Sequence, residues 1–311
     1  MAKGVRMADI AEKLGISIVS VSKALAGKDG VSEEMRAKIL STAEELGYRS
    51  PAAKATATQQ TGGQIIGVLV ADHFFNENTF YSNLYRAILQ HSAPQGISVA
   101  MEIVFPQAEQ SCTMPTFLVN LPFLLLDFYD DAIAADCVLS DNVSGAYQLT
   151  ETILRTGRRE IAFVGSVNAT SSIMDRYLGY TKALLRAGLE PRADWRLEDR
   201  GADGRFIPLT LPQQMPQAFV CSCDEVAYNL VETLRRAGYR VPQDVAVAGY
   251  DDFRYSTICD PPLTSYRVDV DSMAAAAVDQ MRRKMARKHS LAPTIMVPGA
   301  LVVRESTAKQ D

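Results

Sequence analysis

Histidine is scarce in this chain, which has 3 in 311 residues, at His73, His91 and His289. Hydrolytic triads and histidine-based metal sites need histidine beside other reactive groups, so the sequence disfavours both. The 5 cysteines are odd in number and lie mostly in apolar runs, which predicts reduced, buried thiols rather than disulfides. Cys221 and Cys223 have the wrong spacing for most zinc sites, and we expect no metal.

Long apolar runs are also missing. No stretch approaches the roughly 18 apolar residues of a membrane span, and the first residues lack a signal-peptide pattern. We therefore expect a cytoplasmic protein without a membrane partner.

The length predicts two or three structural units. Residues 1–60 carry a net charge of +2 and the remaining 251 carry −6, and a basic N-terminal part is compatible with nucleic acid or with an ordinary solvated surface.

Three short helical patterns precede residue 50. An apolar stripe from Ile10 to Leu14 is interrupted by Gly15, and Ser17 stands where an N-cap would begin a second helix. A third helix is expected to begin at the Ser32 cap. Together these signals predict either a generic bundle of three helices or a helix-turn-helix.

The spacing of three small or apolar residues favours the helix-turn-helix. Two helices cross steeply only if a small residue lies at their contact and a residue with positive φ makes the turn. Ala11, Gly15 and Val21 stand at those places. The outward face of the second helix carries residues that suit thymine methyls, base edges and phosphates, namely Ile18, Val19, Ser22 and Lys23.

These motifs are similar to those of the LacI/GalR family of bacterial transcriptional regulators. The matching strings are VRMADIAEKLGIS (5–17), VSKAL (21–25), VS (31–32) and ELGY (45–48). The resemblance implies a helix-turn-helix DNA-binding domain over 1–49 whose second helix enters the major groove of a palindromic operator. It assigns base reading to Ile18, Val19 and Lys23. It assigns phosphate contacts to Ser17, Ser20 and Ser22.

Residues 50–63 correspond to the hinge helix that the family inserts into the minor groove. The segment lacks the leucine that the family usually wedges between base steps, and Ala57 or Thr58 would occupy that position. An apolar wedge offsets the cost of unstacking with extra contacts, so its loss predicts weaker kinking of the DNA. The alternative is that 50–63 is a flexible linker.

From residue 65 onward, apolar runs alternate with amphipathic helices. The runs predict buried parallel strands at 65–70, 97–103, 123–126, 137–140, 161–164, 218–221 and 245–248. Predicted helices include 142–155, 176–187 and 224–237. The alternation predicts an α/β core of two doubly wound parallel-sheet subdomains that face each other across a cleft. The first would comprise 64–156 plus about 268–290, and the second 157–267 plus about 291–311.

The family resemblance continues through this core and covers most of residues 5–305. It rests on IIGV (65–68), SDNVSGA (140–146), TGRREIAFVG (156–165), DRYLGY (175–180), VAVAGYDD (245–252) and PPLT (261–264). The resemblance implies a core similar to periplasmic binding proteins. A regulator of this family binds a small-molecule effector in its cleft.

Polar residues follow several of the predicted strands and converge on the mouth of the cleft. The candidate ligand-binding residues are Asp127, Arg176, Cys223, Asp224, Tyr250 and Asp251. Carboxylates and an arginine around aromatic rings suit a sugar, because they bind adjacent hydroxyls and stack on its C–H face. The alternative for each aspartate is that it caps the next helix.

Two features depart from the family pattern. Family members commonly have asparagine where this chain has Cys223, which removes a hydrogen-bonding amide and puts the usual ligand class in doubt. Only 19 residues separate Ile103 from Phe123, where the family places two crossovers and a strand, and one crossover already takes about 10–12 residues. Either the protein lacks a strand and a helix there or the sequence omits a stretch, with the junction at Phe117–Asn120.

The sequence therefore predicts a ligand-responsive DNA-binding regulator, a repressor of carbohydrate uptake or catabolism genes. We expect a homodimer, no cofactor beyond a sugar-like effector, and no enzymatic activity, because the consecutive Asp251 and Asp252 would point to opposite faces of a strand. The alternative function is that of a solute-binding protein without a DNA role.

Overall fold

The structure is a computed structural model that describes residues 7–25, 31–46, 64–71, 79–104, 121–286 and 293–308. The chain falls into two compact units, Met1–Val68 with Gly96–Met101 and Leu69–Gln95 with Glu102–Asp311. We call the three N-terminal helices the head and the second unit the body. The predicted hinge at 50–63, with Ala57 and Thr58, and the predicted junction at 117–120 lie outside the described residues.

The head is the predicted arrangement of three short helices, α1 (Met7–Leu14), α2 (Ile18–Leu25) and α3 (Glu33–Glu45). Gly15 makes the turn between α1 and α2 with a φ of +64°, a conformation that costs glycine little. The Ser17 hydroxyl accepts a hydrogen bond from the Ser20 amide at 3.0 Å, and the Ser32 hydroxyl caps α3 through the Met35 amide. One apolar cluster holds the helices together: Ile10, Ala11, Val21, Ala24, Ile39 and Ala43.

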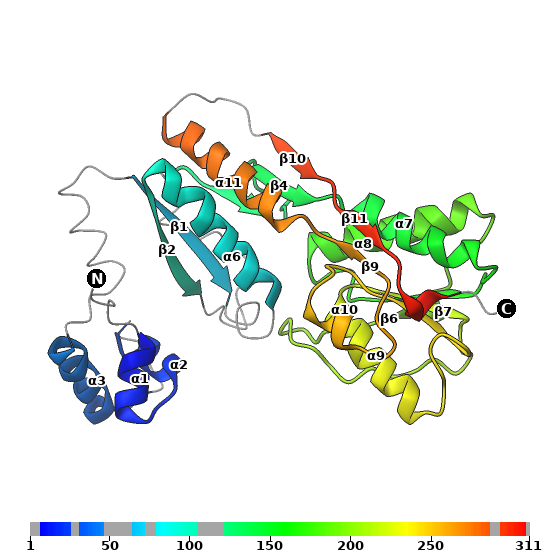
Figure 1. Cartoon of the computed structure of the whole chain (residues 1–311), viewed down its shortest axis with the longest axis horizontal. Helices are drawn as coiled ribbons and strands as arrows, with labels where there is room; N and C mark the ends of the chain where they lie inside the picture. The colour runs from blue at the N-terminus through cyan, green and yellow to red at the C-terminus, as the bar shows by residue number, and fades with distance from the viewer. Residues whose placement is uncertain are drawn as a thin grey trace. The chain divides into compact units, whose positions relative to one another are not determined.

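The first subdomain of the body contains a parallel sheet of three strands in the order β10-β4-β3, formed by Thr294–Val297, Asp136–Ser140 and Leu124–Leu126. Helix α11 (Val270–Met285) contacts all three strands and also packs along α6 (Thr79–Ser92), as Figure 1 shows. The sequence placed residues from about 291 onward in the second subdomain. Strand β10 corrects this placement, because it pairs with β4 and so belongs to the first sheet.

Two further strands, β1 (Gln64–Ala71) and β2 (Ile97–Val104), pair with each other in a separate sheet of two. Within the described residues, no strand joins this pair to the β10-β4-β3 sheet. The short connection noted in the sequence follows β2 directly, and its residues 105–120 lie outside the description.

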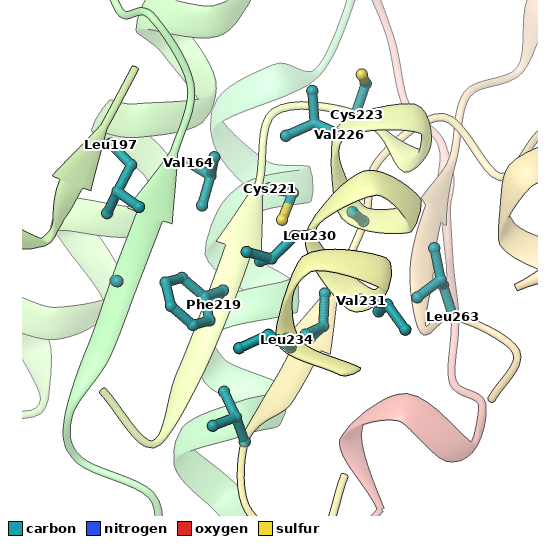
Figure 2. Packing of buried hydrophobic residues seen from close by; sticks show 14 of the residues in the cluster. Val164, Leu197, Phe219, Cys221, Cys223, Val226, Leu230, Val231, Leu234 and Leu263 are labelled. Carbon is teal, nitrogen blue, oxygen red and sulfur yellow. The ribbon is translucent and has the colours of Figure 1, made fainter. Parts of the chain in front are cut away.

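The second subdomain is built on a parallel sheet in the order β6-β5-β7-β8. Its strands are Arg196–Leu197, Ile161–Val164, Ala218–Cys221 and Ala246–Ala248. Helix α9 (Asp224–Arg236) lays Leu230, Val231 and Leu234 toward Phe219 of β7 (Figure 2). The three longer strands, β5, β7 and β8, are apolar throughout and fully buried, because both faces of a parallel sheet are covered, whereas β6 at the edge exposes Arg196.

The connection from β6 to β7 breaks the alternation of strand and helix. Residues 198–217 contain no helix and include Pro208, Pro212 and Pro216, which resist helix formation. This connection packs partly buried apolar side chains against the core that α9 also covers, namely Phe206, Leu209, Leu211 and Met215. An extended segment therefore covers part of the sheet where a helix would be expected.

Helix α8 (Ser171–Arg186) follows β5 and packs along α7 (Asn142–Arg155), which leads from the first sheet to the second. The sequence placed the start of α8 at Arg176. The helix instead begins at Ser171, because the Thr170 hydroxyl caps it by accepting from the Ile173 amide at 3.2 Å. Arg176 thus lies in the second turn rather than at the helix start.

The chain crosses between the two subdomains first through α7. Two short strands make the second and the third crossing. Strand β9 (Ser265–Arg267) follows α10 (Arg254–Ile258) and leads to α11, and β11 (Ala300–Val302) leads from β10 to the short helix η5 (Glu305–Thr307). Strands β9 and β11 pair in antiparallel fashion. Within the described residues, none of the helices combines the length and apolar character needed to cross a bilayer.

Candidate functional site

The candidate ligand residues of the body gather where strands end. Asp127 follows β3 directly, Cys223 and Asp224 follow β7, and Tyr250 and Asp251 follow β8. Because parallel strands all end at the same edge of their sheet, the second sheet brings the β7 and β8 residues together there. Arg176 of α8 joins them, with its Nη2 atom 3.3 Å from the Asp251 Oδ1 atom.

Arg176 is the centre of this cluster and is only 6% exposed. Its Nε donates to the Asn142 Oδ1 at 2.9 Å, its Nη1 donates to the Ser222 carbonyl, and its guanidinium lies 3.8 Å from the centre of the Tyr250 ring. Burial alone would lower the pKa of Arg176, but Asp251, Tyr250 and Asp127 raise it above its usual value. The guanidinium is therefore a permanent charge held in one orientation.

Asp251 is the main charge partner of Arg176. Burial raises the pKa of Asp251 to about 7, against the opposing effect of Arg176. Its backbone adopts a φ of +100°, which is uncommon for a residue with a side chain. The surroundings impose this conformation, since the Asp251 amide donates to the Tyr266 carbonyl at 2.9 Å.

Asp127 offers the site an open hydrogen-bond acceptor. The residue is 4% exposed, its Oδ2 accepts from the Tyr81 hydroxyl at 2.9 Å, and its buried Oδ1 has no partner among the described residues. Burial raises the pKa of Asp127, while Arg176 and Tyr81 lower it. A buried acceptor without a donor is costly, so a ligand hydroxyl or amino group would satisfy it.

Asp224 and Tyr250 also hold other parts of the body. The Asp224 carboxylate accepts from the Ser265 hydroxyl at 2.6 Å and from the Phe253 amide at 2.9 Å. Tyr250 is fully buried, and its hydroxyl donates to the Asp141 carbonyl at 3.3 Å. Both side chains thus have structural partners, and their contact with a ligand stays a prediction.

The head presents its candidate DNA-binding residues at the beginning of α2. Ile18 is 50% exposed and Val19 is 41% exposed, whereas Val21 and Ala24 of the same helix are buried. Ser17 is exposed, and Ser20, Ser22 and Lys23 are half-buried. The helix therefore turns one apolar face into the head and a second, smaller apolar patch outward. Contact of these residues with DNA stays a prediction.

Comparison with known proteins assigns the chain to a family. The family described as "Bacterial regulatory proteins, lacI family" matches residues 6–50, and the one described as "Periplasmic binding protein-like domain" matches residues 150–307. The chain belongs to the LacI family. This identification agrees with the helix-turn-helix of the head and with the two parallel sheets of the body.

The relatives of this LacI-family chain match it over nearly its whole length. The HTH-type transcriptional regulator RegA of Clostridium saccharobutylicum is 26% identical over 331 residues, covering 96% of this chain and 98% of the relative. The ribose operon repressor of Haemophilus influenzae is 23% identical over 328 residues and covers 96% and 98%. The chain is therefore a transcriptional regulator of this family.

Solved LacI-type structures share its fold. A lac repressor dimer bound to operator and the anti-inducer ONPF superposes with a TM-score of 0.66 at 22% identity, covering 98% of this chain and 99% of that one. A complex of the transcriptional regulator CelR with cellobiose gives a TM-score of 0.63 at 19% identity and covers 97% and 99%. At such identities, the likeness establishes the fold alone.

Cys223, the departure from the family pattern, lies within the cluster of this LacI-family chain. It is 6% exposed and directly precedes α9. Burial raises the pKa of its thiol to about 12, with Asp251 adding to the rise, so the thiol stays protonated and is a poor nucleophile. The four described cysteines are free and buried, as predicted; the fifth, Cys112, lies outside the description.

Two residues of the site were missed in the sequence. Tyr81 comes from α6 of the first subdomain and reaches Asp127. Arg200 follows β6 and acts on the site electrostatically, because its charge lowers the pKa of Asp251 and of Cys223. Its guanidinium lies 4.5 Å from the centre of the Phe206 ring, and its Nε lies 3.6 Å from the Asp199 Oδ2. The signal for Arg200 was its place after a strand, but β6 has only 2 residues and gives no apolar pattern.

The described residues contain no group of three or more His, Cys, Asp or Glu side chains that could hold a metal ion. Asp251 and Asp252 have different partners, since Asp251 faces Arg176 whereas Asp252 pairs with Arg267 and Arg304. The site as described is suited to binding a polar molecule through fixed charges.

Proposed function

We propose that this chain is a ligand-responsive, sequence-specific DNA-binding regulator that represses genes of carbohydrate uptake or catabolism. The observation that carries the DNA-binding part is the exposed Ile18–Val19 pair at the capped start of α2. Large apolar side chains at that position would contact thymine methyl groups in the major groove. The relatives described as an HTH-type transcriptional regulator and as a ribose operon repressor support the same function.

Within this function, each predicted DNA-binding residue has a role. Ile18, Val19 and Lys23 read base edges. Ser17, Ser20 and Ser22 contact phosphates, which fixes the position of the helix without reading sequence. Ala57 and Thr58 of the hinge take the place of an apolar wedge and kink the DNA weakly.

A gel shift with DNA from upstream of the protein's own gene tests the DNA-binding part. We expect binding at 50 mM salt that weakens steeply towards 200 mM salt, because phosphate contacts release counterions. Lys23→Ala should weaken binding. Lys38→Ala, on the exposed side of α3, is the matched control and should not. Absence of binding at low salt, or equal effects of the two variants, would refute the proposal.

The effector is a sugar or sugar derivative that binds in the cleft of the body. Asp127 supplies the open acceptor, and Arg176, which Asp251 holds in place, supplies a fixed positive charge. A ligand that prefers one angle between the subdomains shifts the population toward that angle, which alters the fit of two heads to two half-sites. The proposal includes no cofactor and no catalysis.

A thermal-shift assay with ribose and cellobiose, sugars that the descriptions of two relatives name, tests the effector part. A ligand that binds only the folded state raises the unfolding midpoint. We expect at least one sugar to do so, Asp127→Asn to reduce the rise, and Asp203→Asn, which removes an exposed carboxylate, to leave it unchanged. A rise that survives Asp127→Asn intact would contradict the role given to Asp127.

We also propose that the protein acts as a homodimer on a palindromic operator in the cytoplasm, where its DNA lies. Two-fold symmetric operators match two-fold symmetric proteins, and the solved lac repressor is described as a dimer bound to operator. Light scattering should give twice the chain mass of 34.0 kDa. A monomer at micromolar concentration would contradict this assembly.

A further inference from the structure

Asp251 and Asp252 follow β8 as a pair of strained residues. Their φ values are +100° and +55°, in a region that residues with side chains rarely adopt. Such conformations persist where the surrounding structure over-determines them, and they concentrate at functional sites. The two carboxylates also point to different partners, Asp251 to Arg176 and Asp252 to Arg267.

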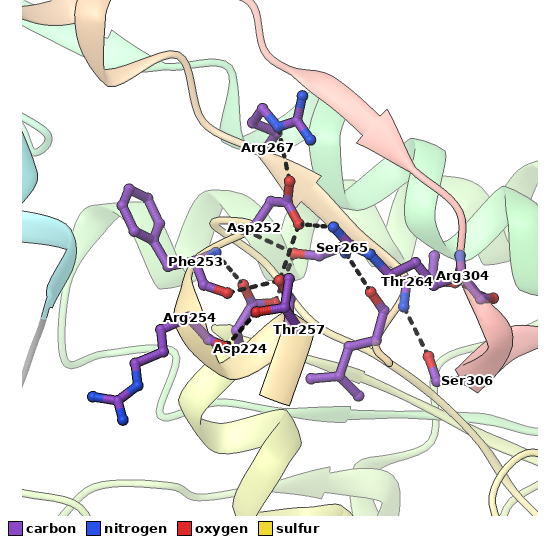
Figure 3. A network of polar contacts seen from close by, with 12 residues as sticks. Asp224, Asp252, Phe253, Arg254, Thr257, Thr264, Ser265, Arg267, Arg304 and Ser306 are labelled. Carbon is purple, nitrogen blue, oxygen red and sulfur yellow. Dashed lines mark hydrogen bonds and ion pairs between the residues drawn. The ribbon is translucent and has the colours of Figure 1, made fainter. Parts of the chain in front are cut away.

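The Asp252 carboxylate joins two arginines that are far apart in sequence. Its Oδ2 lies 2.7 Å from the Arg267 Nε, and its Oδ1 lies 2.7 Å from the Arg304 Nη2. The Ser256 hydroxyl also donates to Oδ1 at 3.0 Å. Figure 3 shows Arg267 and Arg304 reaching the carboxylate from different sides. The side chain of Asp252 is 3% exposed, so these ion pairs are shielded from solvent at their centre.

Both arginines belong to the strands that connect the subdomains. Arg267 is the last residue of β9, and Arg304 stands two residues after the end of β11. Arg304 also donates to the Leu263 carbonyl just before β9 at 2.7 Å. We call Asp252, Arg267 and Arg304 the strand clamp, because one carboxylate ties both connecting segments to the end of β8.

The backbone of Asp251 belongs to the same assembly. Its amide donates to the Tyr266 carbonyl at 2.9 Å, and its carbonyl accepts from the Val268 amide at 3.3 Å. Asp251 is therefore bonded to β9 through its backbone and paired with Arg176 through its side chain. A displacement of Asp251 acts directly on the peptide bond that it shares with Asp252.

We propose that Asp252 is a positioning residue that couples the cleft to the connecting strands, so that the strand clamp sets the angle between the two subdomains. The inference rests on the proposed function for its biological meaning, because it assumes that an effector acts at Asp251. The clamp itself requires neither DNA nor effector. Each subdomain keeps its own sheet when the clamp is broken, and the freedom gained lies in the angle between them.

A distance measurement between two spin labels tests the clamp. One label is placed on α6 through Leu89→Cys and the other on α8 through Leu185→Cys, both at exposed positions, in a chain that also carries Cys112→Ser. The four described cysteines are buried. We expect Asp252→Asn to broaden the distance distribution at least twofold or to shift its maximum. The matched control Asp244→Asn, which breaks a similar pair with Arg240 at the exposed lead into β8, should leave it unchanged.

A purely structural role for Asp252 would lower the unfolding midpoint and leave the distribution of the folded protein unchanged, and that result would overturn the proposal. If Asp252→Asn does not fold, Arg267→Gln replaces it, because the Arg267 side chain is 59% exposed and its loss is easily tolerated. Broadening in Arg267→Gln supports the clamp, and an unchanged distribution overturns it. Failure of the wild-type protein to bind DNA would refute the proposed function and leave this measurement intact.

Discussion

The head and the body place their charged and apolar groups in opposite ways. The head buries six apolar residues and turns Ile18 and Val19 outward. The body buries charged side chains, among them Asp127, Arg176 and Asp251, near the ends of apolar strands. A DNA-binding surface can form on a small domain, because the groove and the phosphates of the DNA supply the partners of its side chains. A site for a small polar molecule must hold its own charges in place, which requires a larger core.

The strongest test of this comparison is the buried arginine of the body. Arg176→Gln removes the cation that faces Asp251 and the donor of two buried hydrogen bonds, so we expect it to lower the free energy of unfolding by about 3–5 kcal/mol. The exposed pair of Arg155 and Glu151 is the control, and Arg155→Gln should cost about 0.3–0.5 kcal/mol. Urea titration followed by circular dichroism measures both. Similar losses in the two variants would show that burial does not distinguish them.

The corresponding test in the head concerns affinity rather than stability. Ile18→Ala should weaken operator binding by about 1–2 kcal/mol, at roughly 0.8 kcal/mol per buried CH₂ group, and should not change the unfolding of the head. Leu40→Ala is matched to it, because Leu40 on α3 is 47% exposed and Ile18 is 50% exposed. Fluorescence anisotropy with labelled operator DNA gives the affinities. Equal weakening in both variants would contradict the assignment of α2 to the groove.

The pH dependence of stability separates a buried carboxyl group from an exposed one. The pKa of Asp251 is about 7 in the folded protein and 3.8 ordinarily, so between these values the folded state holds a proton that the unfolded state has lost. The stability of the wild type relative to Asp251→Asn should therefore fall by about 1.4 kcal/mol for each pH unit between pH 4.5 and 6.5. Urea titrations across that window measure this difference.

Asp244 is the control for this pH experiment. Its pKa is lowered to about 2 by hydrogen bonds from Arg240, so it is ionised in both states throughout the window. The stability difference between the wild type and Asp244→Asn should stay constant from pH 4.5 to 6.5. A constant difference for Asp251→Asn as well would mean that Asp251 does not retain its proton in the folded state.

The smallest expected effect is the loss of a helix cap in the head. Ser17→Ala should destabilise α2 by about 1 kcal/mol, because the Ser20 amide loses its acceptor. Ser41→Ala removes a hydroxyl that bonds to the Lys38 carbonyl within α3 and should be nearly neutral. Hydrogen exchange of the segment 17–25 reports the change. Faster exchange after Ser41→Ala than after Ser17→Ala would contradict the capping argument.

Local signals predicted the head almost completely. The turn at Gly15, the caps at Ser17 and Ser32 and the inward positions of Ile10, Ala11 and Val21 were all confirmed. Each depends on residues within a few positions of one another. The predicted strands were confirmed to within one residue at every end. Those of the second sheet, β5, β7 and β8, are buried apolar runs as predicted, but the expectation of burial was wrong for β1, where only Ile66 is buried.

The site could be predicted only in part. Arg176 and Asp251 form an ion pair, as their expected convergence suggested, and Asp127 interacts electrostatically with both. Asp224 looked equivalent to Asp251, but Ser265 and Phe253 occupy its carboxylate, and this requires knowledge of where β9 and α10 lie. Tyr81 reaches Asp127 from 46 residues away in the chain. Such contacts leave no trace in the local pattern.

The sequence by itself determined the elements and the class of the protein, because helix caps, turns, apolar periodicity and family motifs are properties of short segments. Only the tertiary structure decided where those elements go. It placed β10 beside β4 and left residues 198–217 without a helix. It also brought Asp252 between Arg267 and Arg304. Strand order and ion pairing depend on which segments come into contact in the folded protein. The free energy of those contacts depends on the fold of the whole chain and not on any short segment.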